Sequence, residues 1–220
     1  MKTTLLAPTL NEIEAVGVIL PKIQKEWVDE IIVVDGGSTD GTVEYCQRNG
    51  YFVHKQKGRG YGTGMKDGVA LARGDVIIEF PPDGNSPPDK IPDLIKKIGE
   101  GYDFVVASRY TGGARSYDDD FLTSKGNRVF TWLVNLLFGS GYSDVLIGFR
   151  AYRKDAFNAL KMNAAGLDWS IQMPIQFAKN KFKVAEIPVD EPKRIGGRRK
   201  MSPFRTGWQI LKVLIKEFFR

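Results

Sequence analysis

Short apolar runs without polar alternation constrain the fold of this chain more than any other feature. The segments "EIIVVD" (30–35), "DVIIEF" (75–80) and "DFVVASR" (103–109) are rich in apolar, mostly β-branched residues, and helical patterns lie between them. A strand that is apolar on both sides has to be covered on both faces, and strands that alternate with helices favour parallel pairing. The sequence therefore predicts an α/β fold: a mostly parallel sheet with helices on both faces.

Polar residues follow three of the predicted strands. Asp35, Asp83 and Arg109 each come at or just after the end of an apolar run. In open parallel sheets ligands bind beyond the carboxyl ends of the strands, where such residues meet. We therefore expect a binding site at this edge of the sheet.

Composition excludes several classes of protein. The chain has 220 residues, 42% hydrophobic and 26% charged, which is enough for a globular core. Cys46 is the only cysteine and His54 the only histidine, which excludes a disulfide framework and a zincin site and argues against a Ser-His-Asp triad. The amino terminus lacks a signal-peptide pattern, and no apolar run approaches the roughly 20 residues of a membrane span. We expect a cytoplasmic protein.

Three loops carry candidate chemistry. In "VVDGGSTDGT" (33–42), Asp35 could accept a hydrogen bond from a nucleobase or ribose, although the segment is also a good helix N-terminus. The glycine-dense "KGRGYGTGM" (57–65) lacks the dinucleotide-binding spacing and is interpreted as a tight loop. In "PPDGNSPP" (81–88), prolines stiffen a turn that holds Asp83 and Asn85, whose oxygens suit a hard divalent cation.

Together these segments resemble a known family. "APTLNE", "VVDGGSTDGT" and "GRGYGTGMKDGVALARGDVIIEF" are similar to family 2 glycosyltransferases with the GT-A fold. "ASRYTGG", "GNRVFTWLVNLLFG", "SDVLIGFRAYRK" and the late "KRIGGRRKMSPFRTGWQIL" resemble the polyprenyl-phosphate sugar synthases, the dolichyl-phosphate mannose synthase-like branch. The resemblance covers nearly the whole chain in order. It implies transfer of a sugar from a nucleotide-diphosphate donor, such as a UDP- or GDP-sugar, to a polyprenyl phosphate with inversion.

The resemblance also implies roles on the donor side. The implied nucleotide-binding residues are Pro8, Thr9, Glu12, Asp35 and Asp83. Asp83 and Asn85 would hold Mg²⁺ or Mn²⁺ on the diphosphate. This chain departs from the family pattern at Pro81, where the first aspartate of the metal loop is expected, and at Gly36, where a second aspartate usually follows Asp35. The first departure should weaken the metal site.

On the acceptor side, the resemblance implies a set of basic residues. Arg109, Lys125, Arg128 and Arg150 fall within or beside the branch's acceptor-phosphate motifs, and Ile147 replaces the usual Ser or Thr there. The basic loop would close over the diphosphate through Arg194, Arg199 and Lys200. The residues expected to carry catalysis are Asp83, Arg109, Arg150 and Lys200.

Other functions remain open at this point. A family 2 enzyme acting on a polysaccharide or soluble hydroxyl acceptor would need a carboxylate base, for which Asp144 and Asp168 are candidates. A catalytically idle sugar-nucleotide-binding protein would be compatible with Pro81 and Gly36. The net charge of +6 is concentrated in residues 193–205 and would suit a polyanion, but we expect no nucleic-acid partner, because the transferase motifs explain more of the chain.

The carboxyl-terminal segment has a helical pattern. Phe204, Trp208, Leu211, Ile215 and Phe218 recur on one stripe, with Lys212 and Lys216 off it. This stripe predicts either a helix packed on the core or an interfacial helix on an anionic membrane. We expect a glycosyltransferase domain over 1–203 and an amphipathic helix over 204–220, peripheral at the cytoplasmic face of a membrane or bound to an integral-membrane partner.

Overall fold

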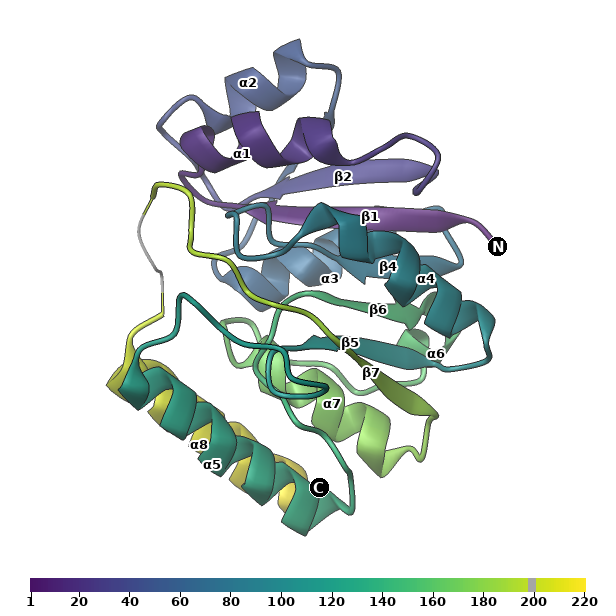
Figure 1. The fold of residues 1–220 in the computed structure, drawn as a ribbon, viewed down its shortest axis with the longest axis vertical. Coiled ribbons are helices and arrows are strands. Elements are labelled where there is room, and N and C mark those ends of the chain that lie inside the picture. Colours follow the sequence, from purple (N-terminus) through teal and green to yellow (C-terminus); the bar gives the residue numbers. More distant parts are fainter. Residues whose placement is uncertain (198–200) are drawn as a thin grey trace.

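The computed structural model describes residues 1–197 and 201–220, and a seven-stranded sheet forms its centre (Figure 1). The strand order is β3-β2-β1-β4-β6-β5-β7. The strands are β1 (Thr3–Thr9), β2 (Glu30–Asp35), β3 (Phe52–Lys55), β4 (Val76–Glu79), β5 (Phe104–Ser108), β6 (Arg150–Arg153) and β7 (Val184–Pro188). All pairs are parallel except those that β6 makes with β4 and β5. The predicted α/β class with a mostly parallel sheet is confirmed.

Helices cover both faces, as predicted. One face carries α1 (Ile13–Ile19), α2 (Thr42–Arg48) and α4 (Ile91–Gly99), with short 3-10 turns at Leu20–Lys22 and Pro88–Lys90. The other carries α3 (Tyr61–Leu71), α5 (Phe121–Phe138), α6 (Lys154–Asn158), α7 (Trp169–Lys179) and α8 (Pro203–Phe218).

Successive residues of each central strand point to opposite faces, so one apolar run supplies both cores. In β1, Leu6 belongs to the cluster beneath α3, α7 and α8, whereas Leu5 and Ala7 belong to the cluster beneath α1 and α4. All three are completely buried. Burial on both sides explains why these strands lack polar alternation.

The antiparallel strand β6 lies between β4 and β5 and pairs Arg150 with Glu79 in register. The two side chains therefore start from neighbouring positions in the middle of the sheet. Both are almost fully buried, at 1% and 0% exposure. This arrangement places an ion pair inside the core.

The carboxyl-terminal helix has two apolar sides. Ile210, Val213 and Leu214 join the core cluster under α5 and α7, so the predicted helical segment 204–220 packs on the rest of the chain. The predicted stripe faces outward instead: Phe204 is 84% exposed and Trp208 60% exposed. The helix is packed on the core, as one of the two interpretations has it, but a different stripe from the predicted one makes that contact. Within the described residues, no helix combines the length and apolar character that crossing a bilayer requires.

Candidate active site

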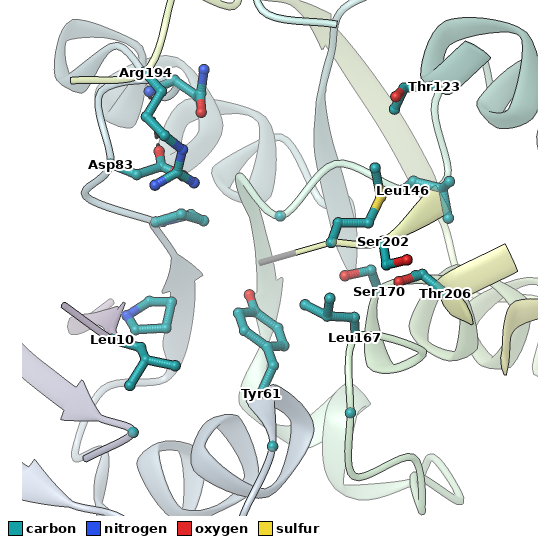
Figure 2. A pocket seen from close by; sticks show the side chains of 18 of the residues that line it. Leu10, Tyr61, Asp83, Thr123, Leu146, Leu167, Ser170, Arg194, Ser202 and Thr206 are labelled. Carbon is teal, nitrogen blue, oxygen red and sulfur yellow. Dashed lines mark hydrogen bonds and ion pairs between the residues drawn. The ribbon is translucent and has the colours of Figure 1, made fainter. Parts of the chain in front are cut away.

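A pocket of about 560 Å³ opens at the carboxyl ends of the strands, where the sequence predicts a site. Its lining comes from the ends of β1 and β2, the loop after β4, the first turns of α3, α5, α7 and α8, and the segment after β7. In Figure 2, Asp83 and Arg194 lie on one side, Ser170, Ser202 and Thr206 lie on the other, and Tyr61 stands between them.

Most of the residues predicted to bind the nucleotide lie at the pocket, and nucleotide binding by them stays a prediction. Pro8, Thr9 and Glu12 line the pocket. Asp35 is 1% exposed and is not among the lining residues. Its carboxylate accepts from the Ser38 hydroxyl at 2.5 Å, and from the Ser38 and Gly37 amides at 3.0 and 2.9 Å. In this structure Asp35 therefore shapes the loop whose Gly36 faces the pocket, and base binding by Asp35 stays a prediction.

The proline-rich loop brings Asp83 and Asn85 to the pocket, and Arg194 holds the loop in place. The Arg194 guanidinium donates to Asp83 at 2.5 Å and to Glu12 at 2.9 Å. Burial raises the pKa of Asp83, and the charge of Arg194 opposes that shift. The side-chain nitrogen of Asn85 donates to the Pro192 carbonyl at 2.7 Å. The side-chain oxygen of Asn85 is therefore left for another partner.

The segment after β7 forms a strap over this loop. The Ile195 amide donates to the Asp83 carbonyl at 2.9 Å, and the Arg194 amide donates to Asp118 at 3.2 Å. The predicted diphosphate residue Arg194 thus lies in the pocket, whereas Arg199 and Lys200 fall outside the described residues.

Arg109 lines the pocket but is held by three carboxylates. Its nitrogens donate to Asp144 at 2.7 and 3.1 Å, to Asp119 at 3.0 Å and to Glu191 at 3.1 Å. Nearby negative charge raises its pKa well above the ordinary value despite burial, so it is permanently charged. Its guanidinium already donates to these carboxylates, and acceptor binding by Arg109 stays a prediction.

The other three predicted acceptor residues lie away from the pocket lining. Lys125 and Arg128 are exposed on α5, where the Lys125 ammonium lies 4.1 Å from the Phe121 ring centroid. Arg150 is a core residue: its Nε donates to Glu79 at 2.8 Å and its Nη1 donates to the Ser170 carbonyl at 2.9 Å. The structure therefore assigns Arg150 a supporting position beneath the pocket rather than contact with an acceptor.

The two candidate bases are also outside the lining. Asp144 is fully buried and accepts from Arg109 and from Asn127. Asp168 precedes α7, and its carboxylate accepts from the Gly166 amide at 2.9 Å. Each of these two carboxylates therefore accepts hydrogen bonds within the fold and stabilises its own surroundings.

Sequence reasoning underestimated the glycine-dense segment at the start of α3. Gly60 adopts φ of 104°, and a Cβ at Gly62 would lie 2.3 Å from the Ala164 carbonyl oxygen. The Gly62 and Thr63 amides donate to the Gly166 and Ala165 carbonyls at 3.2 and 3.1 Å. This close approach positions Tyr61, whose burial raises the pKa of its hydroxyl well above the ordinary value. The high density of glycines was the sequence signal that could have indicated this close approach of two backbone segments.

Gly62→Ala is expected to destabilise the protein by about 1–3 kcal/mol, because the methyl group must push residues 164–166 away. Urea unfolding would measure the loss. Gly126→Ala in α5 is the matched control, since a Cβ there meets nothing within 4 Å and should stabilise by up to about 1 kcal/mol. Equal stability of the two variants would contradict the packing argument.

Sequence reasoning missed the far side of the pocket entirely. Ser170 comes from the first turn of α7, and Ser202, Arg205 and Thr206 come from the start of α8. Isolated hydroxyl residues form no motif, so only the tertiary structure brings them together.

Comparisons with known proteins identify the family. The model of glycosyl transferase family 2 matches residues 4–161. A dolichyl-phosphate hexose transferase from Haloferax volcanii is 31% identical over 94% of this chain and 90% of its own length, and an undecaprenyl-phosphate mannosyltransferase from Micrococcus luteus is 26% identical over 97% and 93%.

The solved structures agree on the fold. Glucosyl-3-phosphoglycerate synthase from Mycobacterium tuberculosis, in complex with Mn²⁺, UDP and glucosyl-3-phosphoglycerate, matches with a TM-score of 0.76 at 20% identity, over 99% of this chain and 80% of that one. The sheet with its surrounding helices is of the GT-A type. The chain belongs to glycosyl transferase family 2 and is a glycosyltransferase.

Proposed function

We propose that this enzyme transfers a sugar, with inversion, from a nucleotide-diphosphate donor to a polyprenyl phosphate. The relatives from Haloferax volcanii and Micrococcus luteus support this acceptor by their names. The observation that carries the proposal is one continuous pocket: it is lined by Asp83 and Asn85 at one side and by the first turns of α5 and α8 at the other. The outer sides of those two helices are apolar.

The loop residues fit a divalent cation. Mg²⁺ and Mn²⁺ take oxygen ligands, and one or two carboxylates with phosphate oxygens and water can suffice. Asp83 and Asn85 both line the pocket, and they offer a carboxylate and an amide oxygen. We infer that these two residues would hold the metal, whose positive charge would stabilise the leaving diphosphate. The solved relative with Mn²⁺ and UDP supports a divalent metal.

Arg194 would then exchange partners. Its Nε is buried and has no hydrogen-bond partner in the described part of the chain, so a ligand oxygen could complete it. In the donor complex the guanidinium would donate to the diphosphate in a bidentate manner. Arg199 and Lys200 remain predicted partners of the same diphosphate.

A phosphate acceptor also suits the placement of the carboxylates. A phosphate monoester is already largely ionised at neutral pH, so the attacking oxygen needs no strong base. A hydroxyl acceptor would need a general base, for which Asp144 and Asp168 are the candidates. Neither residue lines the pocket. Catalysis would rest on positioning and on stabilisation of the leaving group.

We further propose that α5 and α8 dock on an anionic membrane surface. Their exposed residues include Trp132 and Leu136 on α5 and Phe204 and Trp208 on α8, each at least 60% exposed. The seam between the helices is apolar, lined by Leu133, Leu137, Leu211, Leu214, Ile215, Phe218 and Phe219. Lys125, Arg128, Lys212 and Lys216 are exposed on the same two helices. Aromatic burial and basic charge add up in such interfacial helices.

The function is tested by supplying radiolabelled UDP- and GDP-sugars with Mn²⁺ and a short polyprenyl phosphate, then extracting the lipid. Label is expected in the lipid fraction with polyprenyl phosphate and not with the corresponding polyprenol. Transfer to a soluble hydroxyl acceptor alone would favour the alternative enzyme class, and metal-dependent donor binding without any turnover would indicate an idle binding protein. A thermal-shift panel of UDP, GDP, TDP and CDP identifies the base.

Membrane docking predicts salt-sensitive sedimentation with anionic vesicles. The Lys212→Glu/Lys216→Glu variant should lose most of this binding, since each basic residue contributes roughly 1 kcal/mol near an anionic surface. Lys22→Glu/Lys25→Glu is the control, because those residues are exposed beyond α1 on the opposite face of the sheet. Equal binding to neutral and anionic vesicles would contradict the prediction. Deleting residues 204–220 is a poor test, because Ile210 and Leu214 belong to the core.

A further inference from the structure

We propose that the Tyr61 hydroxyl forms a hydrogen bond with a hydroxyl group of the transferred sugar and so helps to select that sugar. This inference rests on the proposed function and deepens it, because it names a residue that contacts the sugar of the donor. It concerns the middle of the pocket, between the loop that carries Asp83 and the side that carries Ser170 and Thr206 (Figure 2).

The proposed reaction places the sugar in the middle of the pocket. Inversion requires the acceptor to attack from the side of the sugar ring opposite to the leaving group. The leaving diphosphate is proposed to lie beside Asp83 and Arg194, so the sugar extends from there towards the other side of the pocket. Tyr61 stands between these two sides (Figure 2).

The backbone around Tyr61 fixes the position of its ring. Tyr61 is the first residue of α3, and glycines on both sides of it pack against the segment before α7. A Cβ at Gly60 would lie 2.3 Å from the Ala165 carbonyl oxygen, and the Gly62 amide donates to the Gly166 carbonyl at 3.2 Å. A side chain that is held in place before binding loses little conformational entropy when the ligand arrives.

The chemistry of the Tyr61 hydroxyl suits a sugar hydroxyl. It donates to Glu79 Oε2 at 3.5 Å, which is longer than the roughly 2.5–3.0 Å of an ordinary O–H···O bond. Burial and the nearby Glu79 carboxylate raise the pKa of this hydroxyl well above its ordinary value, so it is neutral at physiological pH. A phenol that donates to a carboxylate still has an oxygen lone pair with which to accept from a sugar hydroxyl.

The missing side chain at Gly148 leaves this hydroxyl accessible from the pocket. A Cβ at Gly148 would lie 3.6 Å from the Tyr61 hydroxyl oxygen and 3.0 Å from Pro81 Cγ. Gly148, Tyr61 and Pro81 all line the pocket. The hydroxyl therefore lies beside the start of the proline-rich loop, two residues before Asp83, which is where a sugar attached to the diphosphate would begin.

Glu79 holds the Tyr61 hydroxyl from below. Its carboxylate also accepts from Arg150 at 2.8 Å, and from Tyr152 and Trp169 at 3.0 Å each. These three donors are almost completely buried and are not among the lining residues. Of the four donors, Tyr61 alone reaches the pocket, so it is the one that can pass from Glu79 to a ligand.

The experiment measures binding to the full chain by calorimetry, with Mn²⁺ and without acceptor. The ligands are UDP, UDP-glucose, UDP-N-acetylglucosamine, GDP and GDP-mannose. Tyr61→Phe removes the hydroxyl and keeps the ring. This variant is expected to bind the nucleotide-sugar about three- to tenfold more weakly than wild type, and the corresponding nucleotide within about twofold of wild type.

Deoxy analogues of the bound nucleotide-sugar identify the sugar hydroxyl that Tyr61 contacts. The analogue that lacks this hydroxyl should bind wild type and Tyr61→Phe equally, because the hydrogen bond is absent in both complexes. The other deoxy analogues should still bind the variant about three- to tenfold more weakly than wild type.

Tyr152→Phe is the matched control. It removes another hydroxyl that donates to Glu79, but Tyr152 does not line the pocket. Tyr152→Phe should lower Tm by roughly 3–12 °C, because a buried carboxylate loses a donor, and should bind the nucleotide-sugar as wild type does. Tyr61→Phe should lower Tm by less, since its bond to Glu79 is longer.

Equal weakening of nucleotide and nucleotide-sugar in Tyr61→Phe would overturn the inference, because Tyr61 would then contact the base or the diphosphate. Unchanged affinity in Tyr61→Phe would overturn it as well, and so would the same loss of affinity in Tyr152→Phe. If wild type binds none of these donors, the proposed function fails together with the inference. If the expected binding pattern is found but the sugar goes to an acceptor other than polyprenyl phosphate, only the proposed acceptor is rejected and the role of Tyr61 is supported.

Discussion

Replacing Asp83 by alanine is expected to abolish the Mn²⁺-dependent part of nucleotide-sugar binding and to lower turnover by about 10²–10³-fold. Asp83 is the carboxylate of the proline-rich loop, because Pro81 stands where the family pattern has another. Its removal leaves Asn85 as the remaining side-chain oxygen of that loop in the pocket. Thermal shifts with UDP, with and without Mn²⁺, would measure the loss of metal dependence.

Asp93→Ala serves as the control, because the Asp93 side chain is 54% exposed on α4 and pairs with Lys90 at 3.5 Å. An Mn²⁺ effect that survives in Asp83→Ala would show that the metal assignment is wrong. The converse variant Pro81→Asp should strengthen metal binding if the loop keeps its shape, since it restores a second carboxylate. Weaker metal binding in that variant would mean that the proline sets the geometry of the loop.

The second large effect concerns stability. Glu79→Gln is expected to lower the free energy of unfolding by about 3–5 kcal/mol, because it leaves the buried Arg150 without a counter-charge. Glu79 is fully buried and accepts from Arg150 at 2.8 Å, and from Tyr152 and Trp169 at 3.0 Å each. At roughly 2–4 °C per kcal/mol for a chain of this size, Tm should fall by roughly 6–20 °C.

A surface pair provides the comparison. Arg73 is 82% exposed and pairs with Glu30, so Arg73→Gln should cost at most about 1 kcal/mol. Replacing both partners, as in Glu79→Leu/Arg150→Leu, should recover part of the loss because no buried charge is left unpaired. Calorimetric unfolding distinguishes these variants. A Glu79→Gln protein as stable as wild type would mean that Arg150 finds another partner.

Local sequence patterns predicted the layers of this protein, and the family resemblance added the residues of one side of its site. Apolar runs and helical spacing are local properties, so they predicted the sheet, the helices on both faces and the edge where ligands bind. The resemblance to the family, rather than apolar spacing, implied a place in the site for Pro8, Thr9, Glu12, Asp83, Asn85 and Arg194. These residues all line the pocket.

The partner of each charged residue depends on contacts between segments that are distant in the sequence, so it became known from the three-dimensional fold. Arg150 lies in an apparent acceptor motif, yet it pairs with Glu79, 71 residues away, because β6 runs antiparallel beside β4. Arg109 likewise donates hydrogen bonds to Asp144 and Glu191, which are distant in the sequence. Helical spacing correctly indicated an apolar stripe on α8, but a helix with apolar residues on two sides does not reveal which side meets the core. Contacts with α5 and α7 settled that choice, and the same packing brought Thr206 to the pocket.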